Sequence, residues 1–489
     1  MIHESLIYRN KFGSAPMRAL WSEPAMVQRW LDFEAAIALS QGELGIMPMA
    51  TAQRIAAACT IERVTPQAVA AWNDRTGHVI VSLVKAFRDA EPEAGELFHY
   101  GPTTQDVLDT GLVLCIRDSL ELLVPALTRL QQTLSEQALR YRHTVMAGRT
   151  EGQLAVPITF GHKLAVLATE LSDHLMRLAQ CGERLLWLTL FGATGVQSSF
   201  CQIADIPTTQ RLLERVGARL GLRVPVICLH HRTDRYAELG CVLANLLSTL
   251  GEAGLEIRDL QRSELAEVSE PWSDAQHSSS TMPQKQNPET SEWLEGLAKL
   301  ARGYAVSLLD MQQQHERDIS RLAPQLHALP NLFLMAMSAV ESAERIYRGL
   351  QVHETRMAEN VVRNGGAIMA EALMLALAKR SGRKVWAHQR IHDLAMRAAA
   401  RGGNLAEIVA ADAEVAQYMT RAQVEALCVP ANYTGTAAVQ VDAAEALCRA
   451  QECTAQEVFE RVVFNPAAAE RAARGRPQAR TGREHNDNG

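Results

Sequence analysis

Apolar residues recur every three to four positions over most of the chain, and this spacing predicts a protein built almost entirely of helices. Alternating runs of Val, Ile and aromatic residues are scarce, which disfavours a fold based on a sheet. Five segments keep the helical spacing over at least twenty residues: 111–141, 160–190, 236–268, 289–312 and 331–351. Helices of that length exceed the globular average and favour a long bundle. We therefore predict an all-α fold around a central bundle of long helices.

The segment 236–268 is apolar over much of its helical circumference. Such a helix is normally buried on several sides, either inside a domain or between subunits. The pattern therefore favours an oligomer.

Breaks in the helical spacing divide the chain. They fall where Gly, Pro and Ser gather, near 99–103, 191–208, 269–288 and 364–366. We expect a small helical domain over 1–100, the long-helix bundle over 101–355 and a third helical domain over 356–465. The remaining residues, 466–489, are polar and rich in Arg, without apolar anchors, so we expect a disordered tail.

Composition and charge narrow the class of protein. The formal net charge is −6 and no basic stripe is interleaved with aromatic residues, so nucleic acid is excluded as a partner. The nine cysteines are scattered without a C-x-x-C pair, which indicates reduced thiols and no zinc site. The chain shows neither a signal peptide nor an apolar run long enough to cross a bilayer. We expect a cytoplasmic protein without membrane contact, metal or cofactor.

The segment 277–292 concentrates hydroxyl groups, one lysine and backbone N–H groups. Its plainest interpretation is a polar linker between two helices, with Asn287 as N-cap and Pro288 at the first helical position. However, a lysine beside hydroxyl groups can also bind an anionic substrate and lower the cost of forming an alkoxide.

The stretch 279–288, Ser-Ser-Thr-Met-Pro-Gln-Lys-Gln-Asn-Pro, resembles the S-S-x-M-P-x-K-x-N-P signature of the fumarase/aspartase superfamily. That superfamily includes fumarases, aspartases, argininosuccinate lyases, adenylosuccinate lyases and carboxymuconate cycloisomerases. The first of its paired serines is the general base, so the resemblance implies this role for Ser279. It also implies that Lys285 and Asn287 hold the substrate carboxylate next to the carbanion, with Ser280 among the substrate contacts.

Four further segments resemble motifs of the same superfamily. They are Thr-Gly-His at 76–78, Tyr-Gly-Pro-Thr-Thr-Gln-Asp-Val at 100–107, Gly-Arg-Thr-Glu-Gly-Gln at 148–153 and His-Glu-Arg-Asp-Ile-Ser at 315–320. The substrate-binding residues expected from the resemblance are Thr103, Thr104, Gln153, His230 and Arg317, and His78 is expected to be catalytic. Thr103 and Asp106 also fit a capping box that opens the following helix, and both interpretations can hold together.

The resemblance implies a homotetramer with a common core of long helices and active sites shared between chains. It also implies β-elimination from a substituted succinate, which leaves fumarate or a fumaryl product. The proton removed lies beside a carboxylate and is very weakly acidic, because its loss gives a dianionic aci-carboxylate. Catalysis therefore needs cations and oriented donors where this charge develops, together with a base at the carbon.

Several positions at which this sequence differs from the family motifs narrow the choice of substrate. Adenylosuccinate lyases have a histidine acid where this chain has Glu151, and their nucleotide-binding serine and arginine are replaced by Leu322 and Leu326. Their N-terminal Arg-Tyr pair is also absent, since Ile7 precedes Tyr8. We therefore favour a small substituted succinate, either an N-substituted aspartate or a nitrosuccinate-like compound. Adenylosuccinate lyase, a carboxymuconate cycloisomerase-like enzyme and an inactive, crystallin-like structural relative remain the alternatives.

Glu151 is the sharpest of these departures. In relatives that carry the histidine, the glutamate that corresponds to Glu292 pairs with it. If this geometry is kept, two carboxyl groups face each other and share a proton near neutral pH, which makes the pair a general acid for the leaving group. The alternative is that Glu151 pairs with a basic neighbour such as Arg149 or Lys163.

Overall fold

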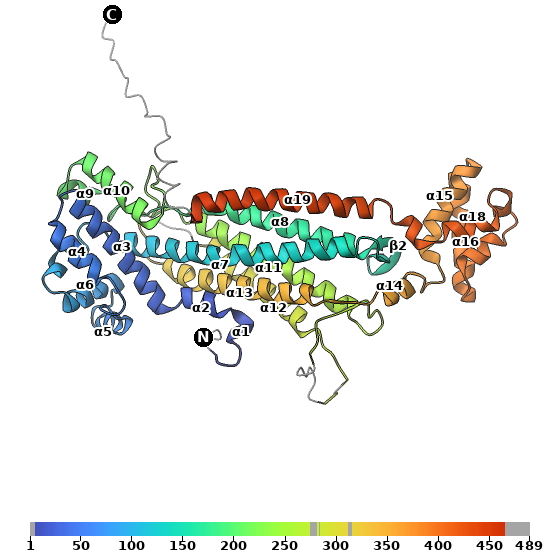
Figure 1. Cartoon of the computed structure of the whole chain (residues 1–489), viewed down its shortest axis with the longest axis horizontal. Helices are drawn as coiled ribbons and strands as arrows, with labels where there is room; N and C mark the ends of the chain where they lie inside the picture. Colours follow the sequence, from blue (N-terminus) through green and yellow to red (C-terminus); the bar gives the residue numbers. More distant parts are fainter. Residues whose placement is uncertain (1–4, 274–280, 283, 312–314, 465–489) are drawn as a thin grey trace, which may run out of the picture.

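The computed structural model describes residues 5–273, 281–282, 284–311 and 315–464. Most of these residues are helical, and Figure 1 shows an elongated molecule whose long helices run side by side along its longest axis. The all-α fold expected from the apolar spacing is thus confirmed.

Helices from residues 23–97 form one end of the molecule, and the two short helices before them lie along the bundle of long helices (Figure 1). Several of them begin with a Ser or Thr N-cap followed by proline, as at Ser14, Ser22 and Thr65, whose hydroxyls accept a backbone N–H of the first turn. The elements are α1 Arg9–Phe12, α2 Ala15–Leu20, α3 Glu23–Glu43, α4 Met49–Ala58, α5 Pro66–Thr76, α6 Val79–Ala90 and the 3₁₀ turn η2 Ala94–Leu97. Helices α9 Ser198–Ile203 and α10 Ile206–Leu220 lie at the same end, where α10 packs on α3.

The five long helices expected from the sequence are all present. They are α7 Thr104–Arg140, α8 Phe160–Leu185, α11 Asp234–Leu260, α12 Glu289–Leu309 and α13 Leu322–Arg348. Their boundaries differ from those of the apolar pattern most at the starts of α7 and α13 and at the end of α11, which stops at Leu260 instead of residue 268. Helix α7 begins at Thr104 because Asp106 accepts the backbone N–H of Thr103 and caps the first turn. Helix α13 includes Pro324, in the first turn where no backbone donor is needed, and tolerates Pro330 in its interior.

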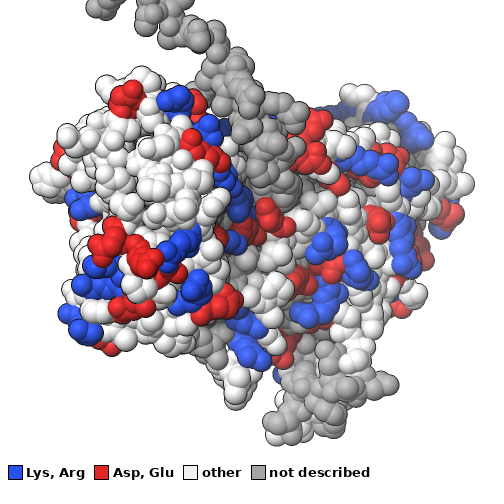
Figure 2. Space-filling view, turned by 60° about the vertical axis from the view of Figure 1, so that its left-hand side comes forward, with Lys and Arg blue, Asp and Glu red and all other residues white. Residues whose placement is uncertain are grey.

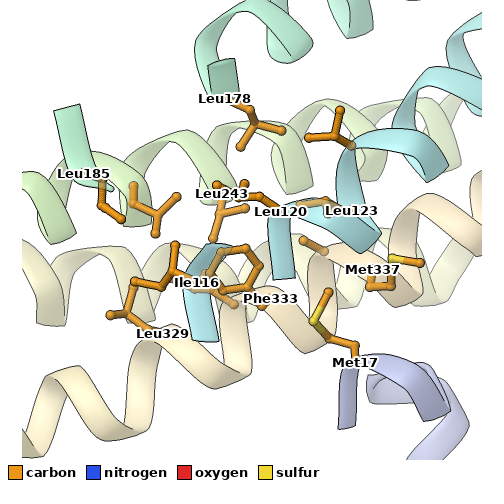
Figure 3. Close-up of a cluster of buried hydrophobic side chains, with 14 of the residues drawn as sticks. Met17, Ile116, Leu120, Leu123, Leu178, Leu185, Leu243, Leu329, Phe333 and Met337 are labelled. Carbon is orange, nitrogen blue, oxygen red and sulfur yellow. The ribbon is translucent and has the colours of Figure 1, made fainter. Parts of the chain in front are cut away.

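Leucine, isoleucine, phenylalanine and methionine side chains from four of the long helices fill the core of the bundle. Figure 3 shows Ile116, Leu120 and Leu123 of α7, Leu178 and Leu185 of α8, Leu243 of α11, and Leu329, Phe333 and Met337 of α13, with Met17 of α2 closing one side. Each fully buried side chain of this size stabilises the fold by about 1.5–3 kcal/mol. Helix α11 packs on α8, α12 and α13 of its own chain, and these contacts account for its apolar circumference.

Two short antiparallel strand pairs lie at the other end of the bundle, and only the first is a hairpin of consecutive strands. Strands β1 Val145–Thr150 and β2 Gln153–Thr159 form the first, and β3 Val268–Ser269 pairs with β4 Gln351–Val352 in the second. The first hairpin lies beyond the end of α7, opposite the N-terminal helices (Figure 1).

The chain then forms a cluster of shorter helices before it returns to the bundle. The cluster contains α14 Glu354–Val361, η3 Ala367–Met369, α15 Ala370–Ser381, α16 Lys384–Arg401, α17 Leu405–Ala410, η4 Val415–Gln417, α18 Arg421–Leu427 and η5 Pro430–Tyr433. Helices α15–α18 surround a separate apolar core that includes Leu373, Leu377, Ile391 and Leu394. Helix α19, Ala437–Phe459, leaves this cluster and runs back along α8 to the π-helical turn η6, Glu460–Phe464 (Figure 1). The expected tail, 466–489, lies outside the described residues.

Lysine and arginine side chains are interspersed with aspartate and glutamate on the face shown in Figure 2. None of the helices in the described part of the chain combines the length and the apolar run that a membrane span requires.

Candidate active site

The turn that precedes α7 presents the hydroxyl groups of Thr103 and Thr104, both half-buried. Beneath it, the fully buried carboxylate of Asp106 accepts the backbone N–H of Thr103 at 2.9 Å. The same carboxylate accepts the N–H groups of Phe191 at 2.7 Å and Gly192 at 3.0 Å. One aspartate therefore fixes the threonine turn to the loop that follows α8.

His78 lies beside this turn as the N-cap of α6. Its Nδ1 accepts the backbone N–H of Val81 at 3.3 Å, and its Nε2 lies 3.5 Å from Thr104 Oγ1. Because Nδ1 is an acceptor, the proton of the neutral ring resides on Nε2. His78 is exposed and offers a hydrogen-bond donor toward the threonine turn.

Arg317 reaches the same turn from the segment that precedes α13. Its Nη1 donates a hydrogen bond of 2.9 Å to Thr103 Oγ1, and its side chain is exposed. The structure thus brings together four of the residues expected from the sequence: two hydroxyls, an imidazole N–H and a guanidinium. Such a set of donors around one positive charge suits a carboxylate.

Glu151 and Gln153 lie at the opposite end of the bundle. Thr150 pairs with Gln153 across the first hairpin, so Glu151 and Gly152 form its two-residue turn, with φ values of 52° and 76°. Positive φ at both positions is typical of a type I′ turn. Both Glu151 and Gln153 are exposed at this tip. At Gly148 a Cβ atom would lie 2.6 Å from the carbonyl oxygen of Val156, so the first residue of the Gly-Arg-Thr motif permits close pairing of the strands.

The basic neighbours of Glu151 are engaged elsewhere. Arg149 forms two hydrogen bonds with the fully buried carboxylate of Glu267, at 2.7 and 3.0 Å. Lys163 pairs with Glu256 at 2.8 Å. The Arg149–Glu267 pair holds the hairpin to β3 and leaves Glu151 exposed at the turn.

The signature segment leads into α12. Ser279 and Ser280 lie outside the described residues. Lys285 is exposed, Asn287 is half-buried, and Glu292 is exposed in the first turn of α12. The stem of this segment is fixed, because Ser291 donates both its N–H and its hydroxyl to Glu270, at 2.7 and 2.6 Å.

His230 takes a position that the sequence does not predict. Its side chain is fully buried, and its Nε2 donates a 3.0 Å hydrogen bond to Asp106. It therefore supports the threonine turn from beneath and does not line the surface where substrate would bind. Burial alone would lower the pKa of His230, but the hydrogen bond to Asp106, one to Cys228 and the charges of Asp106 and Asp109 raise it to about 9.

Several buried residues behind the threonine turn are missed by motif comparison. Asp109 forms a hydrogen-bonded ion pair with Arg321, and both side chains are 1% exposed. One feature of the sequence does point to them. Asp106 and Asp109 are one helical turn apart on α7 and share a helix face, so if they are buried they need cationic or hydrogen-bonding partners. Within residues 5–273, 281–282, 284–311 and 315–464, no group of three His, Cys, Asp or Glu side chains is placed to hold a metal ion.

Comparison with known proteins identifies the family. The family model described as "Lyase" matches residues 16–303, and the model described as "Adenylosuccinate lyase C-terminus" matches residues 366–444. The N-acetyl-S-(2-succino)cysteine lyase of Dickeya dadantii is 34% identical over 89% of this chain and 95% of its own length. The adenylosuccinate lyase of Methanothermobacter thermautotrophicus is 36% identical over 88% of this chain and 96% of its own length.

Solved structures agree with the sequence comparison. The 3-carboxy-cis,cis-muconate lactonizing enzyme of Pseudomonas putida superposes with a TM-score of 0.85 at 32% identity, covering 91% of this chain and all of that enzyme. The family models, the relatives and the solved structure together show that the chain belongs to the fumarase/aspartase superfamily and is an enzyme of its lyase and cycloisomerase group.

Proposed function

We propose that this enzyme catalyses β-elimination from a substituted succinate to give fumarate or a fumaryl product. The observation that carries the proposal is the set of donors at the start of α7, where Arg317 lies 2.9 Å from Thr103 Oγ1 and His78 Nε2 lies 3.5 Å from Thr104 Oγ1. These groups suit one carboxylate of a dicarboxylate. Lys285 and Asn287 would hold the other, beside the carbon that loses its proton.

In the proposed reaction the Ser279 alkoxide removes the proton from the carbon next to a carboxylate. The electron pair moves onto that carboxylate and forms the aci-carboxylate, whose charge faces Lys285. Return of the pair forms the C=C bond and breaks the bond to the leaving group, which carries away the electrons. A proton shared between Glu151 and Glu292 would neutralise an amine or thiolate leaving group.

One relative supports a small leaving group. The N-acetyl-S-(2-succino)cysteine lyase of Dickeya dadantii acts, by its name, on a sulfur-substituted succinate. We extend the proposed substrate class accordingly, from N-substituted aspartates and nitrosuccinate to succinates substituted at sulfur. A screen with succinates that carry amine, thiol and nitro substituents tests the proposal by the ultraviolet absorbance of the fumaryl product. If none of these classes yields it, the proposal fails.

Adenylosuccinate is the second candidate, favoured by the match of the C-terminal family model to residues 366–444. The segment that would face the nucleotide argues against it. Arg321 points into the protein and pairs with Asp109, and Leu326 is 53% exposed. A leucine cannot replace hydrogen bonds to a phosphate. Release of AMP from adenylosuccinate at a rate matching small succinates would favour this candidate instead.

We also propose that the active enzyme is a homotetramer with active sites shared between chains. Helix α12 carries exposed Leu300, Val306 and Leu309, and a groove of about 520 Å³ lies between α12 and the start of α13. Gly303 lines this groove, and a Cβ atom there would meet no neighbour within 4 Å. A glycine inside a helix costs about 1 kcal/mol relative to alanine, so a close approach by another subunit would explain it.

A further inference from the structure

The segment 315–320 is largely exposed, with Ile319 at 78%, yet the next residue is buried. Arg321 is 1% exposed and stands immediately before the first turn of α13. Its Nη2 donates to both carboxylate oxygens of Asp109, each at 2.9 Å. A charged side chain is thus buried next to a solvent-facing segment that carries Arg317.

Both ends of the short stretch from Arg317 to Arg321 contact the beginning of α7. Arg317 binds Thr103, and Arg321 binds Asp109, six residues further along the chain. Along a helix that separation is about 9 Å, and four extended residues span at most about 14 Å. The stretch can therefore lie across the first two turns of α7 with its ends fixed at these two points.

The energetics of the Asp109–Arg321 pair do not suggest a purely stabilising role. Burying two charges costs several kcal/mol each, and apolar replacements of buried pairs are often neutral or stabilising. Gln105 donates to Asp109 at 2.6 Å, but in the described part of the chain Arg321 Nε and Nη1 have no hydrogen-bond partner. The desolvation of the guanidinium is therefore incompletely offset, and another reason for the pair is needed.

We propose that Asp109 and Arg321 are positioning residues that hold Arg317 against the threonine turn, in the orientation needed to bind a substrate carboxylate. The inference rests on the proposed function, because it assumes that Arg317 and Thr103 bind that carboxylate. It adds two residues that touch no substrate and control the affinity of the site through Arg317.

Fumarate is the probe for carboxylate binding, since it is a dicarboxylate that has no leaving group and cannot undergo the elimination. The Asp109→Leu/Arg321→Met variant removes both charges and leaves apolar side chains in their place. Isothermal titration should show fumarate bound at least about tenfold more weakly than by the wild-type protein, the loss expected for one charge-assisted hydrogen bond. Adding Arg317→Met to this variant should weaken binding little further, because the pair acts through Arg317.

Controls separate positioning from general damage. Arg390→Met/Asp412→Asn removes an ion pair of 2.6 Å in the α15–α18 cluster and should leave the fumarate Kd unchanged. Asp109→Asn keeps the shape of the side chain and should weaken binding severalfold even if the double variant does not fold. A wild-type fumarate Kd in folded Asp109→Asn or in the double variant would overturn the inference. So would an Arg317→Met substitution that weakens fumarate binding as much in the double variant as in the wild-type protein. A wild-type protein that does not bind fumarate would overturn the proposed function and this inference with it.

Discussion

Thr104 begins helix α7, and Glu151 lies beyond the opposite end of the same helix. Thr104 is the first residue of α7, which contains 37 residues, and Glu151 turns the hairpin that follows the end of this helix. At 1.5 Å per residue α7 is about 55 Å long, far more than the length of a succinate. If both residues serve one substrate, they must come from different chains.

Complementation between inactive variants tests whether the active sites are shared between chains. Ser279→Ala and Thr104→Ala should each be inactive, but mixed tetramers should regain activity after subunit exchange. In an equal mixture about a quarter of the sites combine an intact turn from one chain with an intact Ser279 from another, if exchange is random. Turnover after exchange is the measurement.

A matched mixture provides the control for complementation. Ser279→Ala with Lys285→Met should stay inactive, because both residues lie on one segment and every site receives one defect or the other. Recovery in this control, or a monomer by light scattering, would contradict shared sites.

Lys285→Met should raise KM and lower kcat, because in the proposed mechanism it deletes a charge that faces the carboxylate in both the ground state and the transition state. We expect a fall in kcat of about 10²-fold, comparable to the loss of one oxyanion donor. Steady-state kinetics on the substrate found by the screen measures both effects. Lys299, an exposed lysine on α12 paired with Glu295, is the matched control, and Lys299→Met should leave both constants unchanged. Unchanged constants in Lys285→Met would place Lys285 outside the site.

Glu151→Gln should slow the release of amine leaving groups more than that of acidic ones, and should remove one ionisation from the pH profile of kcat. The reason is that the amide cannot supply the proposed proton. Glu151→Gly favours the positive φ of the turn and also lacks the carboxyl group. Equal losses in both variants would assign the effect to the missing proton. A Gln variant with the wild-type rate and profile would make Glu151 a residue of the turn only.

The stability of the folded protein should fall as the pH rises from about 6.5 to about 9. The pKa of His230 is raised from 6.5 to about 9 in the folded state, so its stabilising contribution is complete below the unfolded value and is lost as the pH passes the folded one. The contribution is about 3 kcal/mol at 1.4 kcal/mol per unit of pKa. Urea unfolding at fixed protein concentration should show this decline in the wild-type protein and a flatter curve in His230→Gln. If the free energy of unfolding depends on pH in the same way in both proteins, His230 does not make this contribution.

Local signals made much of the fold predictable. The apolar spacing located the five long helices, and the Thr103–Asp106 capping pattern marked the start of α7. The first and last residues of a helix are harder to predict from the sequence where tertiary contacts decide them. Helix α13 continues through Pro330 because its apolar side chains, such as Leu329 and Phe333, are fully buried against the bundle, which offsets the lost backbone hydrogen bond.

The candidate site was predictable only as far as its motifs are local. His78, Thr104 and Arg317 were found from short motifs, but their meeting at one turn depends on how α6, α7 and the segment before α13 pack. The sequence does not predict the hairpin at Glu151, since neither of its strands shows strong alternation of apolar and polar residues. The resemblance implies substrate contact for His230, but the sequence does not reveal that this side chain is buried, and only the fold places it on Asp106.

The return of α19 to the bundle has a consequence for the order in which the protein can be completed during synthesis. Helix α8 emerges early, whereas the helix that covers it, α19, is made only after the whole α14–α18 cluster. Domains that close on consecutive segments can fold as they leave the ribosome, but this bundle cannot close until α19 has been made. Until then, the side of α8 that α19 will cover remains open to solvent and to chaperones.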